Sequence, residues 1–217
     1  MAGGDEHSGT KDSLVEAAER LIAEFGVDAV SIRSINAEAG QNAAATHYHF
    51  GTKEALVAGV IEQHRAPVAA LRGALLDELE ANGVTAHGLA HALVAPLREV
   101  QATEPWGDNY VRFLAALRRA GKPWNDLGVK SFARQRARIE ALVDQLLPDV
   151  PAGVRRFRYL VMSENVLLTL ADRARTERFF GRSVTAGDDD ASALVDFLAG
   201  GLLAPHHELE STRGAVP

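Results

Sequence analysis

Cysteine is absent from the 217 residues, so the chain has no disulfide, no thiol nucleophile and no thiolate metal ligand. No segment approaches eighteen uninterrupted apolar residues, and the N-terminus lacks a basic stretch followed by an apolar run. The sequence therefore predicts neither a membrane span nor a signal peptide. These absences favour a soluble protein of the cytoplasm.

Motifs for nucleotide binding and serine hydrolysis are also missing. The sequence contains no GxSxG, no GxGxxG and no GxxxxGK[ST]. His87 and His91 stand four residues apart, as two ligands on one helix face do, but no third ligand follows nearby. We therefore expect no enzyme activity, no cofactor and no metal site.

Strand patterns are nearly absent, whereas apolar residues recur at spacings of three and four throughout the chain. This periodicity predicts an all-α protein. Four short helices are expected first, at 10–25, 31–39, 43–50 and 53–65, and six longer ones follow, at 67–81, 86–103, 106–120, 125–147, 152–180 and 189–203. Pro96 is expected to kink or split the second of the longer helices.

Two of the short helices fit a helix-turn-helix. Ser31 is a favourable N-cap for the first, and Gly40 is placed to end it. Only Gly40, Gln41 and Asn42 separate it from the next helix, which Asn42 can cap. A short turn containing glycine makes the helices cross steeply, so that the second projects outward, as a helix entering the major groove of DNA must.

The residues around this second helix suggest contacts with DNA. Lys53 lies in the first turn of the following helix, where positive charge is unfavourable unless an anion such as a phosphate sits in front. Alanines on the second helix allow close approach to the groove, and Thr46 and His47 can contact base edges. The alternative is ordinary helix packing with a solvated lysine, and the net charge of −5 over residues 1–65 favours that alternative.

The stretch "SIRSINAEAGQNAAATHYHFGTKEAL" resembles the N-terminal DNA-binding region of the TetR family of bacterial transcriptional regulators, over about residues 11–62. The resemblance implies a homodimeric repressor that reads a palindromic operator on double-stranded DNA and is released by a small molecule bound to its C-terminal domain. It also implies the DNA-contacting residues Ser31, Arg33, Asn42, Ala43, Ala44, Thr46, His47, Tyr48, Thr52 and Lys53. Two positions depart from the family: Thr46 replaces an aliphatic residue, and His47 stands where tyrosine is common. The departure at His47 leaves open whether His47 or Tyr48 contacts phosphate.

The effector side of the chain is less informative. Its aromatic residues gather between positions 100 and 135, at a spacing typical of a core or of a pocket for a mostly apolar ligand. Asn165 interrupts an otherwise apolar helix, where it can orient a ligand, face a dimer surface or reach water. The expected effector pocket therefore comprises Trp106, Tyr110, Phe113, Trp124, Phe132 and Asn165.

We expect a three-helix helix-turn-helix domain at 10–65 and a larger helical domain for effector binding and dimerisation at 66–204, with flexible tails at 1–9 and 205–217. The helices 152–180 and 189–203 are apolar around much of their circumference, and Gly200 and Gly201 allow a close neighbour, which predicts a dimer surface. The alternative function is a dimeric ligand-binding or protein-interaction module without operator binding.

Overall fold

The computed structural model describes residues 4–172, 178 and 189–206. The described residues form helices joined by turns, with no strand among them. The helices are α1 (Gly4–Phe25), α2 (Ile32–Glu38), α3 (Ala45–His49), α4 (Lys53–Asn82), α5 (Ala86–Thr103), α6 (Gly107–Arg119), α7 (Trp124–Ser131), α8 (Ala133–Leu146), α9 (Ala152–Ala171) and α11 (Asp189–Leu203). The predicted all-α class is confirmed.

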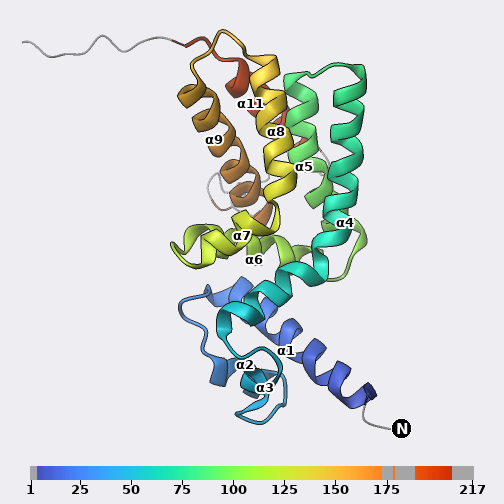
Figure 1. The fold of residues 1–217 in the computed structure, drawn as a ribbon, viewed down its shortest axis with the longest axis vertical. Helices are drawn as coiled ribbons and strands as arrows, with labels where there is room; N and C mark the ends of the chain where they lie inside the picture. Colours follow the sequence, from blue (N-terminus) through green and yellow to red (C-terminus); the bar gives the residue numbers. More distant parts are fainter. Residues whose placement is uncertain (1–3, 173–177, 179–188, 207–217) are drawn as a thin grey trace, which may run out of the picture.

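The molecule is elongated, with the small helices at one end (Figure 1). Helices α1, α2 and α3 form that end, α5, α8, α9 and α11 form the other, and α6 and α7 lie between them. α4 runs from the small end into the larger bundle, and α1 packs against α6. A displacement in the larger bundle therefore has two direct routes to the helix-turn-helix, through α4 and through the helices in the middle.

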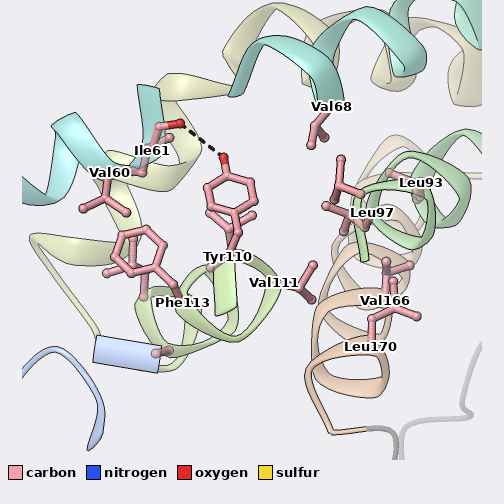
Figure 2. Packing of buried hydrophobic residues seen from close by; sticks show 14 of the residues in the cluster. Val60, Ile61, Val68, Leu93, Leu97, Tyr110, Val111, Phe113, Val166 and Leu170 are labelled. Atoms are coloured by element: carbon pink, nitrogen blue, oxygen red, sulfur yellow. Dashed lines mark hydrogen bonds between the residues drawn. The ribbon is translucent and has the colours of Figure 1, made fainter. Parts of the chain in front are cut away.

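One continuous apolar core joins the two ends. Tyr110 and Phe113 of α6 are fully buried within it, and Figure 2 shows both rings facing Val60 and Ile61 of α4. The Tyr110 hydroxyl donates a hydrogen bond to the Ile61 carbonyl (3.2 Å). Burial raises the pKa of this phenol above its ordinary value, so it stays neutral and acts as a hydrogen-bond donor in the core.

α4 is a single helix, whereas the sequence predicted separate helices at 53–65 and 67–81. Pro67 removes one backbone donor from the helix interior, which costs about 3 kcal/mol. On both sides of the proline the same face is buried, including Ile61, Val68 and Leu76. Burial of a Val or Leu side chain contributes about 1.5–3 kcal/mol, so several such residues offset the cost and hold the helix together.

α5 also continues through its proline, so of the kink or split expected at Pro96 the split does not occur. Proline has no N–H to donate to the carbonyl of Ala92, four residues earlier. That carbonyl instead accepts a hydrogen bond from the Nε atom of buried Arg72 on α4 (3.1 Å). The proline thus leaves an acceptor for a side chain from a neighbouring helix.

Other boundaries differ from the prediction. The expected helix 125–147 is divided into α7 and α8, because the backbone of Phe132 leaves the helical region (φ −110°, ψ 17°). α1 begins at Gly4, six residues before the predicted start. α9 ends at Ala171, and most of the rest of the predicted helix 152–180 lies outside the described residues, as does most of the predicted tail 205–217.

None of the helices in the described part of the chain combines the length and the apolar character that crossing a membrane requires.

Candidate DNA-binding surface and effector cavity

The helix-turn-helix is held by helix caps and by a glycine in its turn, and the sequence predicted the Ser31 cap and the Gly40 break. Ser31 caps α2: its Oγ accepts a hydrogen bond from the Ser34 amide, while the Ser34 hydroxyl oxygen accepts one from the Ser31 amide (both 3.0 Å). Thr52 caps α4 by accepting from the Ala55 amide (3.1 Å). Gly40 in the turn has a φ of 65°, a conformation that favours glycine. These contacts fix where α2 begins and ends and where α4 begins.

α3 covers Ala45–His49, two residues shorter at its start than predicted. Asn42 still stabilises the entry to the helix, because its Oδ1 accepts from the Ala44 amide (2.9 Å). The side chain therefore forms a turn before the helix rather than the N-cap itself.

Most of the predicted DNA-contacting residues are exposed on α2, on α3 or beside them. Tyr48 has 73% of its surface exposed. The exposed members of the set are Ser31, Arg33, Asn42, Ala43, Ala44, His47, Tyr48 and Thr52. They belong to the end of the molecule that is farthest from the large bundle, where a duplex has free access (Figure 1).

His47 has a defined orientation. Its Nδ1 lies 2.9 Å from the Gly51 carbonyl oxygen, which only accepts hydrogen bonds, so Nδ1 carries the proton. In the neutral imidazole this leaves Nε2 as an acceptor. Whether His47 contacts a base edge or a phosphate stays open.

Lys53 has partners within the chain, and its contact with a phosphate stays a prediction. Its ammonium donates to the carbonyls of Val27 and Val30, in the loop between α1 and α2, and lies 5.1 Å from the centroid of the Trp124 ring. Desolvation by burial lowers the pKa of the ammonium, and Asp28 partly opposes this effect. Lys53 thus acts as a clamp on the loop, which is a structural reason for a lysine in the first turn of α4.

Trp124 on α7 completes this cluster. Its Nε1 donates to the Asp28 carboxylate in the same loop (2.9 Å). Asp28, Lys53 and Trp124 therefore connect the helix-turn-helix to α7, which belongs to the middle of the molecule. We name these three residues the loop clamp.

The loop clamp predicts that Trp124→Phe loosens the contact between α7 and the loop. Loss of one indole hydrogen bond to an exposed carboxylate is expected to lower the free energy of unfolding by about 1 kcal/mol. Hydrogen exchange should be faster at the amides of residues 26–31 and unchanged in α9. Equal acceleration in both segments would show general destabilisation instead of a local link.

A cavity of about 630 Å³ lies among α4, α5, α6, α7, α8 and α9, within the size range of ligand sites. Leucines of α5 and α6 and Phe132 supply much of its apolar wall. Two glutamates and four arginines, including Arg72 of α4, also line it. Arg118 crosses one side by donating to Glu164 of α9 (3.1 Å) and to Asn125 of α7 (3.2 Å).

Of the residues predicted for the effector pocket, only Phe132 lines this cavity. Tyr110 and Phe113 are core residues, and Trp124 belongs to the loop clamp. Trp106 stacks on His64 (3.9 Å between ring centroids), and Asn165 donates to the Val161 carbonyl of its own helix (2.8 Å). Aromatic residues at helical spacing were thus mostly core, because large rings fill the centre between helices.

His87 is engaged in a pair rather than in a metal site. Its Nε2 lies 2.8 Å from Asp196 Oδ1 on α11. Among the described residues, no group of three histidine or acidic side chains is arranged to hold a metal ion.

Comparison with known proteins agrees with this arrangement. Residues 14–60 match the family model described as bacterial regulatory proteins of the tetR family, and residues 91–201 match the tetracyclin repressor-like C-terminal domain. Together the two models cover both the helix-turn-helix and the large bundle. The chain belongs to the TetR family. Its members are DNA-binding regulators rather than enzymes.

Solved structures share the TetR fold at low sequence identity. NalD of Pseudomonas aeruginosa, described as the secondary repressor of the MexAB-OprM multidrug efflux pump, superposes with a TM-score of 0.59 at 20% identity, over 91% of this chain and 97% of NalD. FadR of Bacillus subtilis, solved with stearoyl-CoA, gives 0.57 at 13% identity over 90% and 99%. A regulator from Rhodococcus gives 0.54 at 22% identity over 89% and 95%. The comparison with curated proteins found no match.

Thr46, which departs from the TetR pattern, does not face the groove as predicted. It is completely buried, and its hydroxyl donates to Asn36 Oδ1 of α2 (2.6 Å). The Asn36 amide donates in turn to the Ala43 carbonyl (3.0 Å). A polar network therefore joins the two helices where an aliphatic side chain would pack, and the Thr46 side chain is not exposed for a base contact in this structure.

We expect Asn36→Ala to destabilise the helix-turn-helix by about 2–3 kcal/mol, because it leaves the buried Thr46 hydroxyl and the Ala43 carbonyl without their partners. Urea unfolding measures this loss. Combining Asn36→Ala with Thr46→Val removes the orphaned hydroxyl, so the double variant should lose less than the sum of the single changes. Strictly additive losses would contradict the network.

Asn36 and Arg72 are among the residues whose structural or cavity roles the sequence analysis missed. Asn36 follows Ile35 on the buried side of α2, and Arg72 stands between Val68 and Leu76 at spacings of four on the buried face of α4. A polar residue inside an apolar stripe is the signal that identifies both. The identity of their partners requires the tertiary structure.

Proposed function

We propose that this TetR protein is a ligand-responsive transcriptional repressor that binds a palindromic operator as a homodimer and is released by a small-molecule effector. The proposal rests on two features of one chain. The exposed helix α3 of the helix-turn-helix can serve as the recognition helix that enters the DNA groove, and the larger helical bundle contains a cavity. The loop clamp joins them, because α7 both lines the cavity and carries Trp124. Such a regulator acts where the DNA is, and we place it in the cytoplasm.

The dimer is proposed to form through α9 and α11. Phe157 of α9 and Phe197 of α11 are 65% and 69% exposed, and Leu160, Val161 and Leu203 are exposed as well. Exposed apolar groups of this size on two neighbouring helices favour an interface. Gly200 and Gly201 have open space where a Cβ would stand, so a second copy can approach the backbone closely. We name this set of exposed residues the α9–α11 surface.

Two-fold symmetry through this surface would present two copies of α3 to one duplex. Adjacent major-groove half-sites lie about 34–36 Å apart, so the operator would contain two inverted half-sites one helical turn apart. An effector in the cavity would move α7, and through Trp124 the α1–α2 loop, so that both copies of α3 lose this spacing together. A preference of the effector for the released state is sufficient for regulation.

Selection of bound sequences from a random duplex pool tests the proposal with the purified full-length chain. A palindromic consensus with the stated spacing is the expected result. No enrichment, from protein that is folded and dimeric, would contradict operator binding and support the second candidate, a dimeric ligand-binding or protein-interaction module. The net charge of −5 over residues 1–65 is the observation that favours this second candidate.

A further inference from the structure

Arg72 is a buried cation on the wall of the cavity. Its side chain projects from α4, and the residue is only 8% exposed. A buried charge is costly unless it is paired, so such residues usually stand beside a carboxylate. None of the ion pairs among the described residues involves Arg72.

The contacts of Arg72 use only part of the hydrogen-bond donors of its guanidinium. Nε donates to the Ala92 carbonyl that Pro96 leaves free (3.1 Å), and the group lies 5.9 Å from the centroid of the Phe132 ring. Within the described chain, no residue accepts a hydrogen bond from Nη1 or Nη2, and neither atom is closed off from solvent. The two terminal nitrogens are therefore held at the cavity with their donors unused. Desolvation by burial also lowers the pKa of the guanidinium, and Tyr159 and Tyr110 oppose this effect only in part.

The other arginines of the cavity differ from Arg72. Arg118 is paired with Glu164 (3.1 Å) and Arg136 with Glu140 (3.7 Å). Arg156 is exposed, so water solvates its charge. Arg72 alone among these four is both buried and without a carboxylate.

The surroundings of Arg72 are apolar and can hold a hydrophobic body. Val68, Leu93, Leu97, Leu114 and Phe132 line the same cavity. A ligand that completes this site must combine a negative group with an apolar chain or ring system. Two free donors from one planar guanidinium match the two oxygens of a carboxylate. A single compensating charge also favours a monoanion over a phosphate dianion.

We propose that the effector is an apolar carboxylic acid whose carboxylate pairs with Arg72. This assignment rests on the proposed function of the cavity as the effector site. It deepens that function by naming the chemical class of the ligand and the residue that selects it. The apolar body lies against the leucines of the cavity. The carboxylate of the ligand supplies the negative charge that no side chain of the described residues supplies to Arg72.

Displacement of a neutral fluorescent probe, N-phenyl-1-naphthylamine, tests the assignment without DNA. The competitors are decanoate and decanamide, which share their chain and shape and differ in charge. Decanoate should displace the probe from the natural chain at a concentration about tenfold lower, or lower still, because hydrogen bonds to charged groups are stronger than neutral ones. Equal potency of the two competitors would overturn the proposal.

Arg72→Met is the first variant, because methionine has a similar length and no charge. It should reduce the difference between decanoate and decanamide to within about twofold, since the pairing cation is gone. Arg72→Gln is the second variant: its amide keeps a donor for the Ala92 carbonyl, and it should give the same result. Arg156→Met, which removes an exposed arginine of the same cavity, should retain the preference for decanoate. Loss of the preference in Arg156→Met alone would move the anion site to the mouth of the cavity and overturn the assignment.

Thermal unfolding separates a binding effect from a folding effect. Arg72→Gln should unfold at a temperature close to that of the natural chain, because its amide keeps a donor for the Ala92 carbonyl while the buried charge is removed. Decanoate should raise the unfolding temperature of the natural chain and not that of the variant. Failure of the probe to bind any form would overturn the cavity as a ligand site, whereas operator selection tests DNA binding independently.

Discussion

Ala44→Glu is expected to lower operator affinity by roughly 100-fold or more, because a carboxylate placed against the phosphates costs several kcal/mol. Ala44 is exposed at the start of α3, so the larger side chain meets solvent in the free protein. A negative charge at the start of a helix does not oppose its dipole, so folding should be unaffected. Fluorescence anisotropy with the selected operator duplex measures the loss, and circular dichroism checks the fold.

Ala70→Glu is the matched control for this change. It makes the same substitution at an exposed position of α4, outside the helix-turn-helix, and changes the net charge by the same amount. Operator affinity should stay close to that of the natural chain. If both variants lost affinity alike, the effect would come from total charge and α3 would not be the DNA-contacting helix.

Phe197→Glu is expected to convert the dimer to a monomer. Phe197 is 69% exposed in the single chain, so glutamate there costs little for folding, but in the proposed interface it buries an unpaired charge. The monomer has one copy of α3, whereas the dimer has two that bind the same operator. In the dimer, binding of the first α3 raises the effective concentration of the second at its half-site, and the monomer loses this gain. Operator affinity should therefore fall by about 100-fold or more.

Light scattering after size exclusion gives the mass directly. Phe157→Glu, on the neighbouring helix of the α9–α11 surface, should give the same monomer. Phe25→Glu is the control, because Phe25 is a comparably exposed phenylalanine (58%) at the end of α1. It should leave the dimer intact, and a dimeric Phe197→Glu protein would place the interface elsewhere.

Local signals in the sequence were sufficient for the helix-turn-helix. Ser31 caps α2 as predicted, Thr52 caps α4, and Gly26 ends α1 with a φ of 84°. Caps and glycine breaks depend on residues within one turn, so one sequence contains all the information that they need. The same locality explains the matching resemblance over about residues 11–62.

Spacing along a helix does not tell which distant partner a side chain meets. From its place in α4, Lys53 is predicted to contact a phosphate, and in the structure its ammonium also contacts the carbonyls of Val27 and Val30. Thr46 was assigned to a base edge, but Asn36 holds it in the interior. In both cases the sequence placed the residue correctly in its helix. The direction of its side chain depends on contacts with residues distant in the sequence, which helical spacing does not predict.

The sequence by itself determined the all-α class, the caps and turn of the helix-turn-helix, and the TetR family, because periodicity, capping and motif order are properties of neighbouring residues. Only the tertiary structure decided that α4 and α5 continue through Pro67 and Pro96, since burial along a whole helix face outweighs one lost hydrogen bond. Only the tertiary structure decided which residues line the cavity. Arg72 lies there because packing of α4 against α5 brings it to the carbonyl that Pro96 leaves free, twenty residues away in the chain.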